Sequence, residues 1–153
     1  MKSIFLLAVL AVTSGAWAAA ENPMVGTWKV NLEKSKFSPG PAPQSLTVKI
    51  EAAGEGVHVT SEGMDAEGKP IATEYTANYD GKDYPIKGSL TADTVSLKRI
   101  DKRHATRTDK KDGKVVQTTK RSIAKDGKSF TMDTTGKNAK GQAVHNVTVF
   151  EKP

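Results

Sequence analysis

Cysteine is absent from the 153 residues, which excludes disulfides, thiol catalysis and thiolate metal sites. Aromatic residues make up only 6% of the chain. From residue 21 onward, 41 of 133 residues are apolar, enough for one inward-facing layer. No stretch of ten residues carries an apolar stripe of helical period. These shortages predict a small, nearly all-β domain stabilised by packing alone.

The one long apolar run stands at the N-terminus. Residues 4–12 are apolar throughout, Lys2 precedes them, and residues 16–20 offer two small-x-small cleavage patterns. The run is shorter than the ~20 residues that span a bilayer, which disfavours a membrane anchor. We therefore predict a signal peptide over residues 1–20, cleaved after Ala18 or Ala20. The mature domain, 21–153, is expected in the periplasm or outside the cell.

Glycines recur at regular intervals along the mature chain. Asp-Gly pairs occur at 80–81, 112–113 and 126–127. A tight hairpin turn needs positive φ, which glycine adopts without steric cost, so Asp-Gly between extended segments indicates a hairpin. A repeat of one strand and one turn, with no room for helices, predicts an up-and-down meander.

Between these turns, apolar and polar residues alternate as they do in half-buried strands. Residues 45–52 show the pattern most cleanly, with Leu46, Val48 and Ile50 on one face. Eight segments alternate, and residues 84–90 and 103–109 could add two more. A meander with one apolar face removes its free edges by closing. We therefore predict a single up-and-down antiparallel β-barrel of eight to ten strands.

Two segments fit this pattern less well. Residues 33–44 hold three prolines within five positions and are expected to form an extended linker, with one helical turn before it as an option. Residues 103–109 contain one alanine and no larger apolar residue. We expect this segment to be an edge strand protected by its charges, or the place where the barrel is open.

The most specific local pattern is Gly26-Thr27-Trp28-Lys29-Val30 at the start of the mature domain. It resembles the opening Gly-x-Trp of the calycin superfamily, which includes the lipocalins and the intracellular fatty-acid-binding proteins. The ending Val149-Phe150-Glu151-Lys152 is similar to the last strand of the fatty-acid-binding branch. The whole chain resembles small secreted bacterial proteins of lipocalin-like type. This resemblance implies a barrel that binds a small hydrophobic ligand, with Trp28 plugging one end or contacting the ligand.

The chain departs from the fatty-acid-binding branch in two places. That branch carries two lid helices between its first two strands, and residues 33–44 are too short for them. It also ends in Arg-x-Tyr, whose side chains hold a carboxylate. The matching positions here are Thr148 and Phe150, which supply no charge.

Arg121 is the cation that strand parity places inside the barrel. It shares a face with Val115 and Ile123, so it points inward if they do. An inward arginine could hold an anionic head group in a bidentate fork, or it could reach solvent or pair with an acid. Tyr75 and Tyr79 could line the wall as core or as ligand contacts. The candidate ligand-binding residues are Trp28, Tyr75, Tyr79, Arg121 and Phe130.

Positive charge is concentrated in residues 98–128, which hold twelve Lys or Arg and four Asp. Such a face can attract an anionic envelope polymer, or it can simply be solvated. The segment has no aromatic residue for base stacking, so no specific nucleic-acid binding is expected. The candidate basic face consists of Lys98, Arg99, Arg103, Arg107, Lys110 and Lys111.

Evidence for catalysis is thin. The three histidines, at 58, 104 and 145, form no metal-binding pattern, and no nucleophile elbow or phosphate-binding loop occurs. Three hypotheses follow: a barrel holding a small hydrophobic or amphipathic molecule, a filled barrel acting through its basic face, and, less favoured, a hydrolase or isomerase at the barrel mouth. We expect a monomeric binding protein without catalytic residues, metal, cofactor or membrane span.

Overall fold

The computed structural model describes residues 22–153, so the predicted signal peptide lies outside the described residues. Ten strands follow one another, and no helix occurs between residues 22 and 153. They are β1 (Gly26–Ser38), β2 (Ser45–Ala53), β3 (Gly56–Met64), β4 (Pro70–Ala77), β5 (Tyr84–Lys87), β6 (Thr94–Arg99), β7 (His104–Lys111), β8 (Lys114–Ile123), β9 (Ser129–Lys137) and β10 (Ala143–Glu151).

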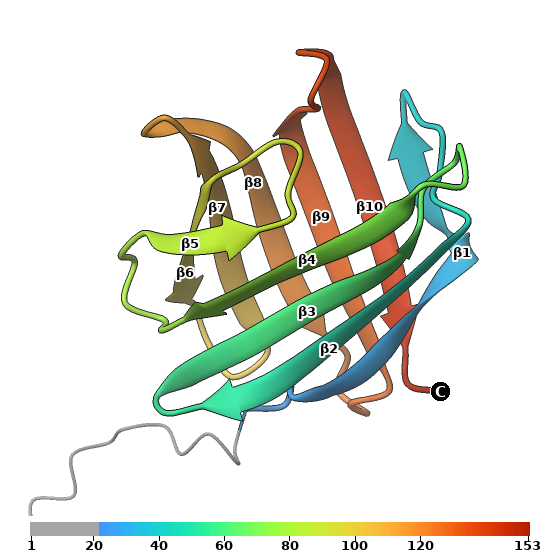
Figure 1. Ribbon diagram of the computed structural model, residues 1–153. Helices are drawn as coiled ribbons and strands as arrows, with labels where there is room; N and C mark the ends of the chain where they lie inside the picture. Colours follow the sequence, from blue (N-terminus) through green and yellow to red (C-terminus); the bar gives the residue numbers. More distant parts are fainter. Residues whose placement is uncertain (1–21) are drawn as a thin grey trace, which may run out of the picture.

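The strands form one closed antiparallel barrel (Figure 1). Each strand pairs with its neighbours in sequence, and β1 closes the barrel by pairing with β10. The three Asp-Gly pairs lie at turns, with Gly81, Gly113 and Gly127 at φ of 74°, 77° and 70°. The predicted up-and-down barrel of eight to ten strands is confirmed.

The two ends of the barrel differ in their side chains. The end at which β1 begins, at the bottom of Figure 1, is here named the closed end. Its centre is Trp28, fully buried, whose ring lies 5.5 Å from that of Phe130. Phe130 lies in turn 5.9 Å from Phe150, also fully buried. The Trp28 indole donates its N–H to the Met24 carbonyl at 2.9 Å, so the polar atom of the plug is satisfied.

The opposite end, at the top of Figure 1, is here named the mouth. It is bounded by the Pro-rich loop 39–44, the turns around 65–69 and 112–113, the loop 88–93 and the turn 138–142. The strand with the fewest paired residues in the barrel wall is β5, which forms two residue pairs with β4 and two with β6. Gly88 ends this strand against the Ala72 carbonyl, where a Cβ would lie 1.9 Å from the oxygen at a φ of +78°.

Two segment predictions need correction. Residues 103–109 are neither an edge nor an opening, because β7 pairs along its length with both β6 and β8. Its inward charges are tolerated because they pair with each other, as described below. Residues 33–38 form no helical turn, since β1 continues to Ser38 after a bulge between Asn31 and Lys36.

The structure also corrects the face predicted for Val115. Val115 is 58% exposed, because a bulge between Asp109 and Lys110 shifts the register where β8 begins. In β10 the inward residues are Thr148 and Phe150, both buried, so Val147 and Val149 face outward. The large Phe150 ring fills the interior beside Phe130, and the smaller β-branched valines cover the outside of the strand.

Candidate ligand-binding interior

Arg121 lies inside the barrel, as its parity predicted, with a relative exposure of 2%. Its Nη2 donates to the Tyr75 hydroxyl across the barrel at 2.8 Å. Its Nε and Nη1 are buried and have no hydrogen-bond partner within residues 22–153. A guanidinium stays charged in a protein, so this is a buried cation with unused donors. Nη2 keeps one hydrogen that Tyr75 does not use. This hydrogen and one of the two unpartnered nitrogens could together donate a bidentate pair of hydrogen bonds to one anionic group.

A second inward-facing arginine, Arg107, has a side-chain exposure of 14% and a different environment. Its Nε and Nη2 donate to the two carboxylate oxygens of Asp109 at 2.6 and 2.8 Å. Its guanidinium carbon also lies 4.9 Å from the centre of the Tyr75 ring. Burial alone would lower the pKa of Arg107, but Tyr75 and Asp109 raise it above its ordinary value. Arg107 and Asp109 therefore form a compensated pair, whereas Arg121 keeps an uncompensated charge.

The interior changes from large apolar to small and mixed side chains between Arg121 and the mouth. Cross-strand partners share a face, which places Thr119 and then Gln117 after Arg121 on the inward face of β8. Thr119 is buried and bonds the Thr134 hydroxyl at 2.8 Å. Nearer the mouth, most inward positions are half-buried and small or apolar: Phe37, Leu46, Ser61, Gly63, Ile71, Thr73, Thr134, Gly136, Val144 and Asn146.

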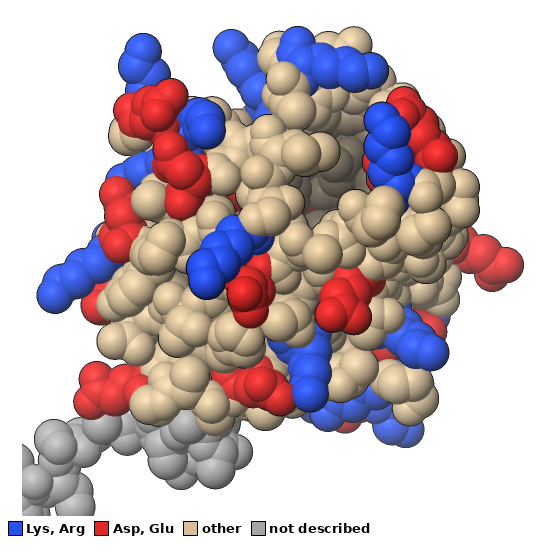
Figure 2. Space-filling view, viewed as in Figure 1, with Lys and Arg blue, Asp and Glu red and all other residues tan. Residues whose placement is uncertain are grey.

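The space-filling view is hollowed at this end of the molecule (Figure 2). Short side chains such as those of Ser61 and Thr73 fill less of the interior here than Trp28, Phe130 and Phe150 do at the closed end. The lining combines apolar patches with hydroxyl and amide groups. Such a combination of apolar wall and a few polar groups is typical of small-molecule sites.

Tyr79 takes a different position from Tyr75. Its hydroxyl accepts a hydrogen bond from the Asn22 side chain at 3.1 Å, near the closed end. Burial raises the pKa of Tyr79, although Arg121, Asn22 and Arg99 act in the lowering direction. The candidate ligand-binding residues therefore fall into two groups. Tyr75 and Arg121 meet below the mouth, whereas Trp28, Phe130 and Tyr79 pack at the closed end.

The predicted basic face is not one surface. Arg107 does not belong to it, because its side chain is inside the barrel, where Asp109 compensates its charge. Lys110 pairs with Asp83 at 3.0 Å, and Arg99 donates its Nε to the Asp101 carbonyl at 3.1 Å. Lys98 covers the turn at Gly81, Arg103 lies at the closed end and Lys111 at the mouth. Alternation along β6 and β7 separates side chains that the sequence places close together.

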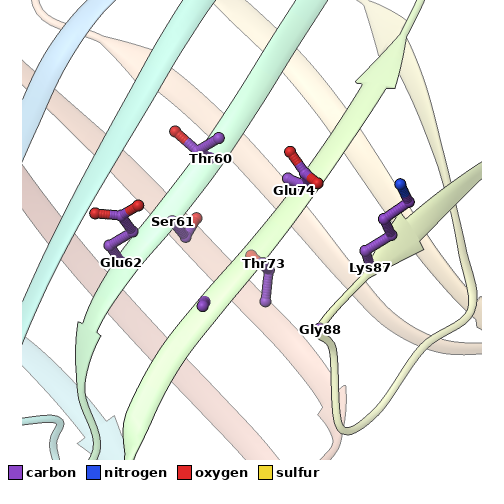
Figure 3. Close-up of a pocket in the computed structure, with 8 residues that line it drawn as sticks. Thr60, Ser61, Glu62, Thr73, Glu74, Lys87 and Gly88 are labelled. Carbon is purple, nitrogen blue, oxygen red and sulfur yellow. The ribbon is translucent and has the colours of Figure 1, made fainter.

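A polar depression of about 180 Å³ opens on the outer wall beside β5 (Figure 3). It is lined by the outward residues Thr60, Glu62 and Glu74, by Lys87 and Gly88, and from the inner side by Ser61 and Thr73. The three histidines lie on the outer surface, each near one carboxylate, as with His145 and Asp133 at 2.8 Å. No cluster of three metal-ligating side chains occurs in residues 22–153.

Comparison with known proteins places this geometry in a fold. No family model and no curated protein sequence matches the chain. Among solved structures, the zebrafish ileal bile acid-binding protein complexed with cholic acid matches with a TM-score of 0.51 and 14% sequence identity. The alignment covers 86% of this chain and 99% of that chain. The fold is a calycin-like barrel.

Trp28 lies inside the closed end of the barrel, where the resemblance placed it as a plug, and Phe150 of the last strand is buried beside it. No helix of the part described, 22–153, is long and apolar enough to cross a membrane. Sequence reasoning missed the Arg107–Asp109 pair. Opposite charges two residues apart on one strand share a face, and this spacing was the signal that could have revealed it.

Proposed function

We propose that the protein is an exported, non-enzymatic binding protein that holds a small amphipathic anion inside its barrel. The observation that supports this proposal most strongly is Arg121, a buried guanidinium with two unpartnered nitrogens. An isolated buried charge is costly unless it is paired, so the interior is complementary to an anion. The head group would meet Arg121 and the Tyr75 hydroxyl, and the apolar part would extend toward Phe37, Leu46 and Ile71 at the mouth.

The fold supports this proposal, since the zebrafish bile acid-binding protein, which has a similar fold, holds cholic acid in its solved structure. In this barrel the Arg-x-Tyr positions are Thr148 and Phe150, and both are buried inside. An arginine and a tyrosine meet instead from β8 and β4. In the fatty-acid-binding branch the arginine and the tyrosine stand together on the last strand. Here Arg121 and Tyr75, which meet across the barrel, would take their place.

Calorimetric titration of the processed protein with dodecanoate, cholate and dodecanol tests the proposal. Dodecanoate or cholate should bind, and Arg121→Met should weaken that binding about tenfold or more, because a charge-assisted hydrogen bond contributes ~1.5–3 kcal/mol. Dodecanol affinity should change little in the same variant. Failure of every probe to bind, or equal loss of dodecanol and dodecanoate, contradicts the proposal.

Export is a separate part of the proposal, supported by the sequence of residues 1–20. The intact mass of protein recovered from the periplasm or medium of its own host should correspond to a chain that begins at Ala19 or Glu21. An intact chain recovered from the cytoplasm would contradict export. The same spectrum under native conditions should show an added mass if the ligand remains bound. The filled-barrel alternative predicts no added mass and retention on an anionic polymer.

A further inference from the structure

Exposed large apolar side chains gather at the mouth. Five such residues occur in the described part of the chain, and three of them lie at this end: Leu90, Val115 and Met64, with exposures of 87%, 58% and 39%. Single exposed apolar residues are common, but several on one rim indicate a surface that contacts something apolar.

Leu90 and Val115 lie on two segments that are hydrogen-bonded to each other. Asp93, in the Leu90 loop, donates its backbone N–H to the Lys110 carbonyl at 2.9 Å. Its carboxylate accepts the backbone N–H of Asp112 at 3.0 Å. The β5–β6 loop and the β7–β8 turn are therefore held side by side. Their apolar side chains belong to one part of the rim.

Lysines flank these apolar residues. The segments 110–115 and 137–142 contain five lysines and one aspartate, an excess of four positive charges. Lys110 is paired with Asp83. Lys111, Lys114, Lys137 and Lys140 are exposed and form no ion pair within residues 22–153. Figure 2 shows blue side chains at this end, beside the hollow.

The closed end is also basic but lacks the apolar rim. Lys102, Arg103 and Lys125 line a depression of about 480 Å³ there, over Ile123. Among residues 22–153, Ile100, at 64%, is the one large exposed apolar residue of this end. Charge by itself would not choose between the ends. The combination of apolar side chains with lysines favours the mouth, because interfacial binding needs both apolar burial and attraction to anionic lipid.

We propose that the mouth rim formed by Leu90, Val115, Lys111, Lys114, Lys137 and Lys140 docks on an anionic lipid membrane. Leu90 and Val115 enter the headgroup region and the lysines contact lipid phosphates. The mouth then faces the lipid phase, from which an amphipathic anion can pass into the barrel. The transfer rests on the proposed function, whereas the docking itself does not.

Co-sedimentation with vesicles tests the docking. Wild-type protein should bind phosphatidylglycerol-containing vesicles at least tenfold more strongly than pure phosphatidylcholine, and high salt should weaken this binding. The triple variant Lys111→Glu, Lys114→Glu, Lys140→Glu should lose about tenfold or more in affinity. The double variant Leu90→Ser, Val115→Ser should lose several-fold.

The closed end supplies matched controls. Lys102→Glu, Lys125→Glu, Lys128→Glu reverses the same number of charges, and Ile100→Ser removes an exposed apolar residue; both should change affinity by less than about twofold. An equal or larger loss in these controls, or no vesicle binding by the wild type, overturns the proposal. The mouth variants should keep their calorimetric affinity for dodecanoate in solution. Failure of docking is thus distinguished from failure of ligand binding.

Discussion

The two halves of this barrel share one wall but have different interiors. Toward the closed end, Trp28, Phe130 and Phe150 fill the space and are almost fully buried. Toward the mouth, Ser61, Thr73 and other small residues occupy equivalent inward positions and are half-buried. The same alternating pattern can therefore build a packed core at one end and room for a ligand at the other.

The layer between the halves shows the same contrast on a smaller scale. Arg107 has a bidentate carboxylate partner, whereas Arg121 has one hydrogen bond to Tyr75 and two unpartnered nitrogens. Both arginines point into the barrel from neighbouring strands. One therefore serves stability, and the other is proposed to serve binding.

Replacement of each arginine in turn by methionine should show the largest difference between these roles. Arg107→Met leaves Asp109 buried without a partner and should lower the free energy of unfolding by ~3–5 kcal/mol. Arg121→Met removes an uncompensated charge and should leave stability unchanged or higher. Urea unfolding of the two variants measures the difference. Restoration of most of the loss in Arg107→Met by adding Asp109→Leu would identify the unpaired carboxylate as its cause.

Truncation of an aromatic residue in each half comes next in expected effect. Trp28→Ala should cost ~3–5 kcal/mol, because it empties a large space in a packed core. Phe37→Ala at the mouth should cost less, about 1–2 kcal/mol, since its ring is half-buried. Denaturant midpoints at constant m-value report both losses. Comparable losses would show that the mouth half is packed as tightly as the closed half.

Addition of an aromatic ring should also cost more stability in the packed part of the barrel than near the mouth. Ala105→Phe introduces a ring at a position with 2% exposure and should destabilise by ~1–3 kcal/mol through overpacking. Ser61→Phe, on the inward face near the mouth, should cost less than about 1 kcal/mol and should abolish dodecanoate binding by filling the site. Retention of full affinity by Ser61→Phe would move the ligand out of the mouth half.

The smallest expected effect is on the pH dependence of stability, which reports whether water reaches the Tyr79 hydroxyl at the closed end. Burial raises the pKa of Tyr79, so the folded state favours its neutral form. Its contribution to stability is present below the unfolded tyrosine pKa of about 10 and is lost as pH rises through the folded value. Tyr79→Phe should therefore lessen the fall in stability above that pH in thermal unfolding experiments. An unchanged slope would indicate that water reaches the hydroxyl.

Much of this fold could be predicted from local patterns in the sequence. Asp-Gly turns and alternation along residues 45–52 were enough to predict the meander, and parity placed Arg121 inside. The errors arose where packing between strands decided the outcome. The bulge at Asp109 and Lys110 turned Val115 outward.

The interior site could be predicted only in part for the same reason. Segment 103–109 has almost no apolar residue, so its inward charges were assigned to the surface. They are buried because Arg107 and Asp109 satisfy one another, a long-range consequence of barrel closure. The hydrogen bond between Arg121 and Tyr75 joins β8 to β4 across the barrel. Local sequence patterns do not predict which residues meet across the interior.

The Nε–H resonances of the two buried arginines in a ¹⁵N–¹H spectrum test the central claim most directly. Arg107→Met and Arg121→Met assign the signals. On addition of dodecanoate, the account predicts that the Arg121 signal shifts and its exchange with water slows, while the Arg107 signal stays in place. A bound ligand that moves the Arg107 signal and leaves Arg121 unchanged would contradict it.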